Sequence, residues 1–148
     1  MPAAPPTLRA RALKALARRE HSRQELKAKL QPFAEDAEEI EPLLDELEKR
    51  GWLSEARFVE QLTTVRRRKF GAPRILHELR QKGISETALA ATQNQLKVSE
   101  FEAAHAVWVK KFGKLPATAQ ERAKQARFLA GRGFSAEIVH RVLRGEDQ

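Results

Sequence analysis

The sequence has no cysteine and no tyrosine among its 148 residues, and aromatic residues make up only 6%. The missing thiols exclude disulfides, cysteine metal ligands and thiol nucleophiles, which fits a reducing compartment. No apolar run is long enough to cross a membrane, and the first residues contain no apolar signal-peptide core. We therefore expect a soluble, cytoplasmic protein that makes no membrane contact.

Residues that favour β-strands are also scarce. Runs of Val, Ile, Thr or aromatic residues are few, whereas Ala, Leu, Glu, Lys, Arg and Gln dominate. Apolar residues recur at helical spacing, for example Ile40, Leu43, Leu44 and Leu47. The sequence therefore predicts an all-α fold.

One short pattern occurs three times, at residues 51–54, 83–85 and 133–135. Each begins with a glycine that ends a helix, continues with an apolar residue and finishes with a serine that can cap the next helix. The second and third copies lie fifty residues apart. This period predicts repeated helical units.

We predict three tandem three-helix repeats, resembling helix-turn-helix units, at residues 7–51, 52–98 and 99–148, after a disordered N-terminal segment at residues 1–6. Because each repeat is too small to bury a large core alone, stacking of neighbours should give an elongated molecule. The alternative is one compact bundle in which the period is accidental.

Capping residues and breakers predict where the helices begin and end. Ser22 with Glu25, and Ser99 with Glu102, have the spacing of capping boxes. Pro73 fits the first position of its helix. The expected helices are 8–18, one after Ser22 that ends at Pro32, 37–50, one after Ser54, 73–82, 86–96, one from Ser99 to Phe112, 118–131 and one after Ser135.

Motifs for catalysis are missing. The sequence has no Gly-rich phosphate loop and no nucleophile elbow. The four histidines have no metal-ligand spacing, so we expect them on helix surfaces. These observations favour a binding protein over an enzyme.

The net charge is +8 and the isoelectric point is near 10.2, but the charge is unevenly distributed. Residues 35–48 hold eight acids and no base, whereas residues 51–98 hold nine bases and four acids. Such an excess favours a polyanionic or acidic partner. The alternative is a soluble protein with ordinary charged helix faces.

The basic run at residues 66–69 is the most informative cluster. Arg67 should lie almost opposite the apolar face of its helix, and Arg57 and Arg68 should share one flank. Pro73 would bring Arg74 close to them, whereas Arg66 and Lys69 turn away. A cationic patch of Arg57, Arg67, Arg68 and Arg74 is therefore the leading candidate for a partner contact.

Ordinary ion pairing is the alternative explanation of this patch. Arg74 could pair with Glu78, and Arg57 with Glu60 or Gln61, each contact contributing a few tenths of a kcal/mol. Two further basic surfaces rank lower. They comprise Lys110, Lys111, Lys114, Arg122, Lys124 and Arg127, and Arg9, Arg11, Lys14, Arg18 and Arg19.

The middle of the chain resembles the RecX family. Residues 51–59 read GWLSEARFV and are similar to the family motif G-W-L-x-[DE]-x-R-F; residues 74–84 read RILHELRQKGI and are similar to R-I-x-x-E-L-x-x-K-G-I. Residues 18–26 are similar to the family's opening segment. Ser54 stands where the family often has Asp, but both residues cap helices well.

This resemblance implies three tandem three-helix units and a regulator that binds the RecA recombinase and its filament on single-stranded DNA. It implies inhibition of strand exchange, ATP hydrolysis and co-protease activity, and so control of recombinational repair and the SOS response. It implies weak binding to single- or double-stranded DNA and no cofactor. We expect a monomer whose main polar contact is made by Arg57, Arg67, Arg68 and Arg74, with Lys82 secondary.

Two other classes remain open. A helix-turn-helix transcriptional regulator would need a recognition helix with base-reading side chains on one face, and residues 73–82 offer only Arg74, His77, Glu78 and Gln81. A scaffold that binds protein alone is the third class.

Overall fold

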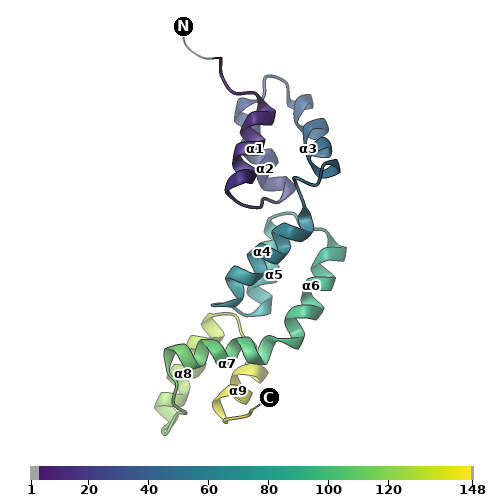
Figure 1. Cartoon of the computed structure of the whole chain (residues 1–148). Coiled ribbons are helices and arrows are strands. Elements are labelled where there is room, and N and C mark those ends of the chain that lie inside the picture. Colours follow the sequence, from purple (N-terminus) through teal and green to yellow (C-terminus); the bar gives the residue numbers. More distant parts are fainter. Residues whose placement is uncertain (1–3, 148) are drawn as a thin grey trace. The chain divides into compact units, whose positions relative to one another are not determined.

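The computed structural model describes residues 4–147, and in that range the chain forms helices and no strand, so the all-α prediction is confirmed (Figure 1). Residues 4–6 of the segment expected to be disordered are exposed and have no regular secondary structure, while residues 1–3 lie outside the described range. The elements are α1 (Leu8–Arg18), α2 (Arg23–Leu30), η1 (Gln31–Phe33), η2 (Ala37–Glu39), α3 (Ile40–Lys49), α4 (Glu55–Arg67), α5 (Ala72–Gln81), α6 (Glu86–Val98), α7 (Glu100–Lys111), α8 (Ala119–Gly131) and α9 (Ala136–Leu143).

The chain divides into two compact units. The first contains residues 1–61 and 82–84, and the second contains residues 62–81 and 85–148. The boundary therefore falls inside α4. The repeat boundaries at 51/52 and 98/99 and the expected elongated shape stay predictions.

The three glycine–apolar–serine segments have the structure predicted for them. Gly51, Gly83 and Gly133 have φ of 75°, 77° and 92°, a conformation that glycine adopts without strain. The serine hydroxyls of Ser54, Ser85 and Ser135 each accept a hydrogen bond from a backbone N–H of the next helix. The apolar pairs flanking these caps are buried, namely Leu53 and Phe58, Ile84 and Leu89, and Phe134 and Val139.

Two helix starts differ from the prediction. Ser22 and Glu25 form the expected capping box, but Ser99 makes no side-chain cap on α7. Its hydroxyl instead accepts a hydrogen bond from Arg67 and points back to the last carbonyls of α6. The second difference is at α5, which begins at Ala72, so Pro73 occupies its second position.

The core of the first unit lies between α1, α2 and α3, which stand together in the purple to blue part of Figure 1. Its most buried side chains include Leu26, Leu30, Leu44 and Leu47, each at most 1% exposed. These residues repeat every three or four positions along their helices, as an inward face requires.

The core of the second unit joins α7, α8 and α9, and it contains Phe101, Trp108, Leu129 and Val142. The indole N–H of Trp108 donates to Gln125 Oε1 at 2.8 Å, which satisfies the one polar atom of this buried ring. Helices α5 and α6 of the same unit are in contact, and Ile75 and Leu79 on α5 and Leu89 and Leu96 on α6 are buried.

A close backbone contact also holds the second unit together. The N–H of Gly71 donates to the carbonyl of Arg132 at 2.8 Å. A Cβ on Gly71 would lie 2.4 Å from the carbonyl oxygen of Gly133, which is too short for any side chain. Glycine at position 71 is therefore required by space rather than by its φ angle.

We predict that Gly71→Ala lowers the free energy of unfolding of the second unit by more than about 2 kcal/mol, because backbone must move to accept the methyl group. Trp108 fluorescence in a Trp52→Phe background, followed through a urea titration, measures this unit. The matched control is Gly131→Ala, whose Cβ would meet nothing within 4 Å. Equal stability of the two variants would contradict this account.

Candidate partner-binding surface

The five residues predicted to contact a partner fall in two units. Arg57 and Lys82 belong to the first unit, and Arg67, Arg68 and Arg74 to the second. The prediction that Arg57 shares one patch with Arg68 and Arg74 stays a prediction.

Arg57 is held by groups of its own unit. Its Nε donates to Glu20 Oε1 at 2.8 Å, and its Nη2 donates to the carbonyl of Gly51 at 2.7 Å. The expected pairing of Arg57 with Glu60 or Gln61 is not seen, because its acidic partner is Glu20. The side-chain oxygen of Gln61 accepts a hydrogen bond from the backbone N–H of Glu20. The side chain remains 47% exposed, so Arg57 can meet a partner while this bridge is in place.

Lys82 takes part in a network around Glu25. Lys82 Nζ lies 3.2 Å from Glu25 Oε2, and Arg19 Nη1 lies 2.9 Å from Glu25 Oε1. Burial alone would raise the pKa of Glu25, but hydrogen bonds from Arg19, the Ser22 N–H and Lys82 outweigh it and lower the pKa to about 2. A partner would therefore compete with Glu25 for Lys82.

The prediction that Arg67 lies opposite the buried face of its helix is wrong. Its side chain is only 15% exposed, and its Nη1 lies 3.1 Å from Oε2 of Glu100, whose side chain is 9% exposed. Nη2 donates to the carbonyl of Leu96 at 2.6 Å and to Ser99 Oγ at 3.1 Å. Residues at the start of α7 contact Arg67 at the end of α4. The spacing of residues along α4 alone cannot predict this contact.

The Glu100 carboxylate completes this network at the start of α5. Its two oxygens accept the N–H of Ala72 at 3.1 and 3.2 Å. An acidic group at a helix N-terminus also complements the helix dipole. Arg67 and Glu100 are therefore positioning residues for four helix ends of the second unit.

Arg74 sits at the glycine contact described above. Its Nη1 donates to the carbonyl of Gly131 at 3.0 Å, and its guanidinium stacks 4.1 Å from the centroid of Phe70. The alternative pairing with Glu78 is wrong, because Arg66 Nε holds Glu78 at 2.8 Å. Arg66, Lys69 and Arg74 line one cavity of about 400 Å³ with Phe70, Ile75 and Glu78.

Arg68 lies in a second, more strongly positive depression, here called the basic cleft. Its cations come from the two residues after α4, the end of α7 and the residue after α8, and its volume is about 230 Å³. Its lining residues are Arg68, Lys69, Lys110, Lys111 and Arg132, together with Val107 and Phe128.

The five cations of the basic cleft have no acidic neighbour in its lining, and within residues 4–147 none of them forms an ion pair. Lys111 and Arg132 lie over Phe128, at 5.4 and 4.8 Å from the ring centroid. Concentrating unpaired like charges in a depression favours an anion there. The cleft can bind carboxylates or phosphates without breaking an internal bridge.

The sequence patterns did not predict all of this cleft. Lys69 was expected to turn away, yet it lines both cavities, and Lys110 and Lys111 were assigned to a separate, lower-ranking surface. Arg132 has only one local signal, its place directly before Gly133. Only the packing of α7 and α8 brings these cations together with the end of α4.

The expectation that His21 lies on a helix surface is also wrong. It is 1% exposed rather than on a helix surface, and its Nδ1 lies 3.0 Å from the carbonyl oxygen of Arg19. Burial lowers the pKa of His21, because the charged ring would lose hydration there. His21 is therefore part of the packing of the first unit.

Models of the first, second and third three-helix domains of RecX match residues 9–47, 54–92 and 99–143. The chain belongs to the RecX family. The protein named regulatory protein RecX from Ralstonia nicotianae is 46% identical over 99% of this chain and 92% of its own length. That from Leptothrix cholodnii is 48% identical over 95% and 90%.

Solved structures agree with the family fold. The crystal structure of RecX from Lactobacillus salivarius has a TM-score of 0.74 and 17% identity, and covers 93% of this chain and 92% of that one. Three tandem three-helix domains, as predicted, are thus confirmed. No helix within residues 4–147 combines the length and apolar character needed to cross a bilayer.

The Arg67–Glu100 pair yields a stability prediction. Glu100→Gln keeps the shape but leaves Arg67 without its counter-charge, so we expect the free energy of unfolding of the second unit to fall by about 3 kcal/mol. The control is Glu78→Gln, which removes the more exposed Arg66 pair and should cost less than about 1 kcal/mol. Trp108 fluorescence in urea measures both, and equal losses would contradict the assigned role.

Glu25 yields a prediction on pH. Because folding lowers its pKa from 4.5 to about 2, the stability it contributes is complete above about pH 4.5 and is lost as the pH falls toward 2. Glu25→Gln should lower stability at pH 7 by about 2 kcal/mol and flatten the acid dependence in that window. Circular dichroism during denaturation at several pH values measures this; an unchanged slope would refute it.

Proposed function

We propose that this protein binds RecA and its filament on single-stranded DNA and inhibits strand exchange, ATP hydrolysis and co-protease activity. Its membership of a family whose relatives are named regulatory proteins supports a regulatory role. The resemblance of residues 51–59 and 74–84 to the family motifs carries the assignment of RecA as the partner. The consequence would be control of recombinational repair and of the SOS response in the cytoplasm, by a monomer.

The basic cleft is the proposed main contact, and Arg74 extends it on the neighbouring cavity. Arg68, Lys69, Lys110 and Lys111 present charge that no internal carboxylate neutralises within residues 4–147. Arg57 and Lys82 are proposed as secondary contacts, because each already forms an ion pair with a carboxylate of its own unit. Arg67 is not proposed as a contact, because its side chain is enclosed and paired with Glu100.

The proposed activity is binding rather than catalysis. The five cations of the basic cleft can attract carboxylates on a protein filament and phosphates of DNA, which suits binding. Phosphate contacts of this kind give the weak binding to single- and double-stranded DNA that we include in the proposal.

Removing two cleft charges should weaken inhibition. We expect Arg68→Ala with Lys110→Ala to raise the concentration needed to inhibit RecA ATP hydrolysis at least about fivefold, on the order of 1 kcal/mol, with helicity unchanged. The matched control is Arg80→Ala with Lys124→Ala, which removes two exposed charges of the same unit outside both cavities. The proposal fails if the two double variants inhibit equally.

Arg68→Ala with Arg74→Ala tests the extended surface in the same assay. This variant also loses the Arg74 bond to the Gly131 carbonyl, so urea unfolding must accompany it. Weaker inhibition with an intact second unit supports the surface; unchanged inhibition opposes it.

The rival function is a helix-turn-helix transcriptional regulator. Binding to RecA filaments, single-stranded DNA and duplex DNA at two salt concentrations separates the two. A regulator of RecA binds filaments more tightly than naked DNA at both concentrations, whereas contacts to phosphates alone weaken steeply with salt. Filament affinity no higher than that for naked DNA would overturn the proposal.

A further inference from the structure

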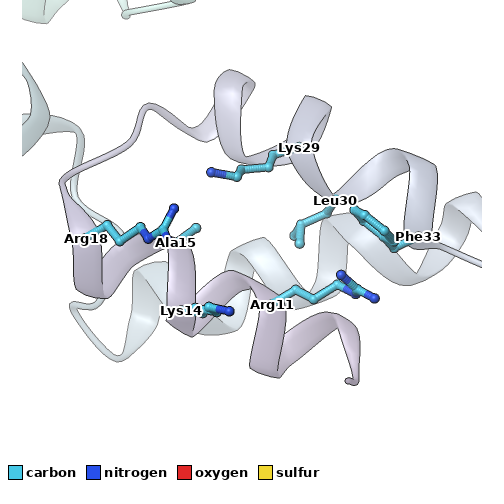
Figure 2. Close-up of a pocket in the computed structure, with 7 residues that line it drawn as sticks. All are labelled: Arg11, Lys14, Ala15, Arg18, Lys29, Leu30 and Phe33. Carbon is cyan, nitrogen blue, oxygen red and sulfur yellow. The ribbon is translucent and has the colours of Figure 1, made fainter. Parts of the chain in front are cut away.

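The first unit contains a separate groove between α1 and α2, with a volume of about 240 Å³ (Figure 2). Figure 2 shows Arg18 and Lys29 toward one end, Arg11 and Phe33 toward the other, and Leu30 between them. The lining residues are Arg11, Lys14, Ala15, Arg18, Lys29, Leu30 and Phe33. This set is here called the α1–α2 groove.

Four of these residues are cations and none is an acid. Within residues 4–147, the side chains of Lys14, Arg18 and Lys29 form no hydrogen bond or ion pair. They are therefore available to an external anion.

Four acids of the run at 35–48 are paired with other basic residues of the unit. Arg23 holds Glu41, Asp45 and Glu48. Lys27 also holds Glu41, and Arg9 and Arg50 both hold Glu46. These acids therefore pair with Arg9, Arg23, Lys27 and Arg50, and none of them lines the α1–α2 groove.

The floor of the groove is apolar. Leu30 and Ala15 belong to the core and are 1% and 4% exposed, whereas Phe33 is 52% exposed, which is high for an aromatic side chain. The Arg11 guanidinium lies 3.7 Å from the Phe33 ring centroid and covers one face of the ring. A nucleic-acid base could stack on that face of Phe33 only by displacing Arg11. Phosphate groups would gain nothing from contact with the apolar floor.

We propose that the α1–α2 groove binds a short acidic segment of a partner protein. Carboxylates of the segment pair with Lys14, Arg18 and Lys29, and one apolar side chain between them packs on Leu30 and Phe33. Charge complementarity selects an acidic ligand, and the apolar floor selects a peptide over nucleic acid. The groove shares no residue with the basic cleft, so this proposal does not rest on the proposed function.

The test uses the full-length protein and a fluorescently labelled synthetic peptide with glutamates on both sides of a central leucine. Anisotropy should show saturable binding that Lys14→Ala with Arg18→Ala weakens at least about fivefold. The matched control, Lys49→Ala with Lys124→Ala, removes two exposed and unpaired charges outside the groove and should leave affinity within about twofold. Circular dichroism checks that both variants fold.

Two further ligands separate the alternatives. Replacing the central leucine of the peptide with serine should weaken binding about tenfold, since burying a leucine contributes roughly 1.5 kcal/mol or more. A single-stranded oligonucleotide of equal net charge should bind more weakly than the peptide. Equal binding of the serine peptide, tighter binding of the oligonucleotide, no saturable binding, or no effect of the Lys14–Arg18 change would each overturn the proposal. No RecA is present, so failure here leaves the test of the basic cleft unaffected.

Discussion

The ion pair between Arg67 and Glu100 fixes the second unit, and the geometry of the basic cleft depends on it. Through Glu100 it reaches the first N–H of α5, and through Arg67 it reaches the carbonyl of Leu96 in the last turn of α6. A pair this enclosed must have nearly all its hydrogen-bonding groups satisfied to offset the loss of hydration. The network meets that condition except at Arg67 Nε, which is buried without a partner in the described part of the chain. The pair joins the end of α4 to the start of α7, and Arg68 follows α4 while Lys110 lies on α7, so it links the two elements that carry these cations.

Internal pairing sorts the basic residues into two kinds. Arg23, Arg57, Arg66 and Lys82 each face a carboxylate of their own unit and help to hold helices together. Nine other cations line the basic cleft and the α1–α2 groove, whose linings contain no acid, whereas cations such as Lys49, Arg80 and Lys124 are exposed outside both. Net charge alone does not make this distinction, because it counts both kinds equally.

Much of the fold could be predicted from the sequence, because local signals determine it. The stop, apolar residue and cap at Gly51, Gly83 and Gly133 act within a few residues, and the structure confirms all three. The failures have one physical cause. Ser99 looks like a cap and Arg67 looks exposed when each helix is considered alone, but packing brings them together and changes both roles. His21 likewise looks exposed from sequence alone but is 1% exposed in the structure.

The candidate site was less predictable than the fold. The sequence places Arg68 on the helix that follows Ser54, whereas in the structure it comes directly after α4, and the other cations of the cleft include Lys110, Lys111 and Arg132, all more than forty residues later in the sequence. The absence of cysteine offers a direct measurement. Lys110→Cys in the cleft and Lys124→Cys on exposed α8 each introduce a unique thiol, whose maleimide labelling rate can be followed with and without RecA filaments. The account predicts strong protection at position 110 and none at 124; equal labelling at both positions, with filaments bound, would contradict it.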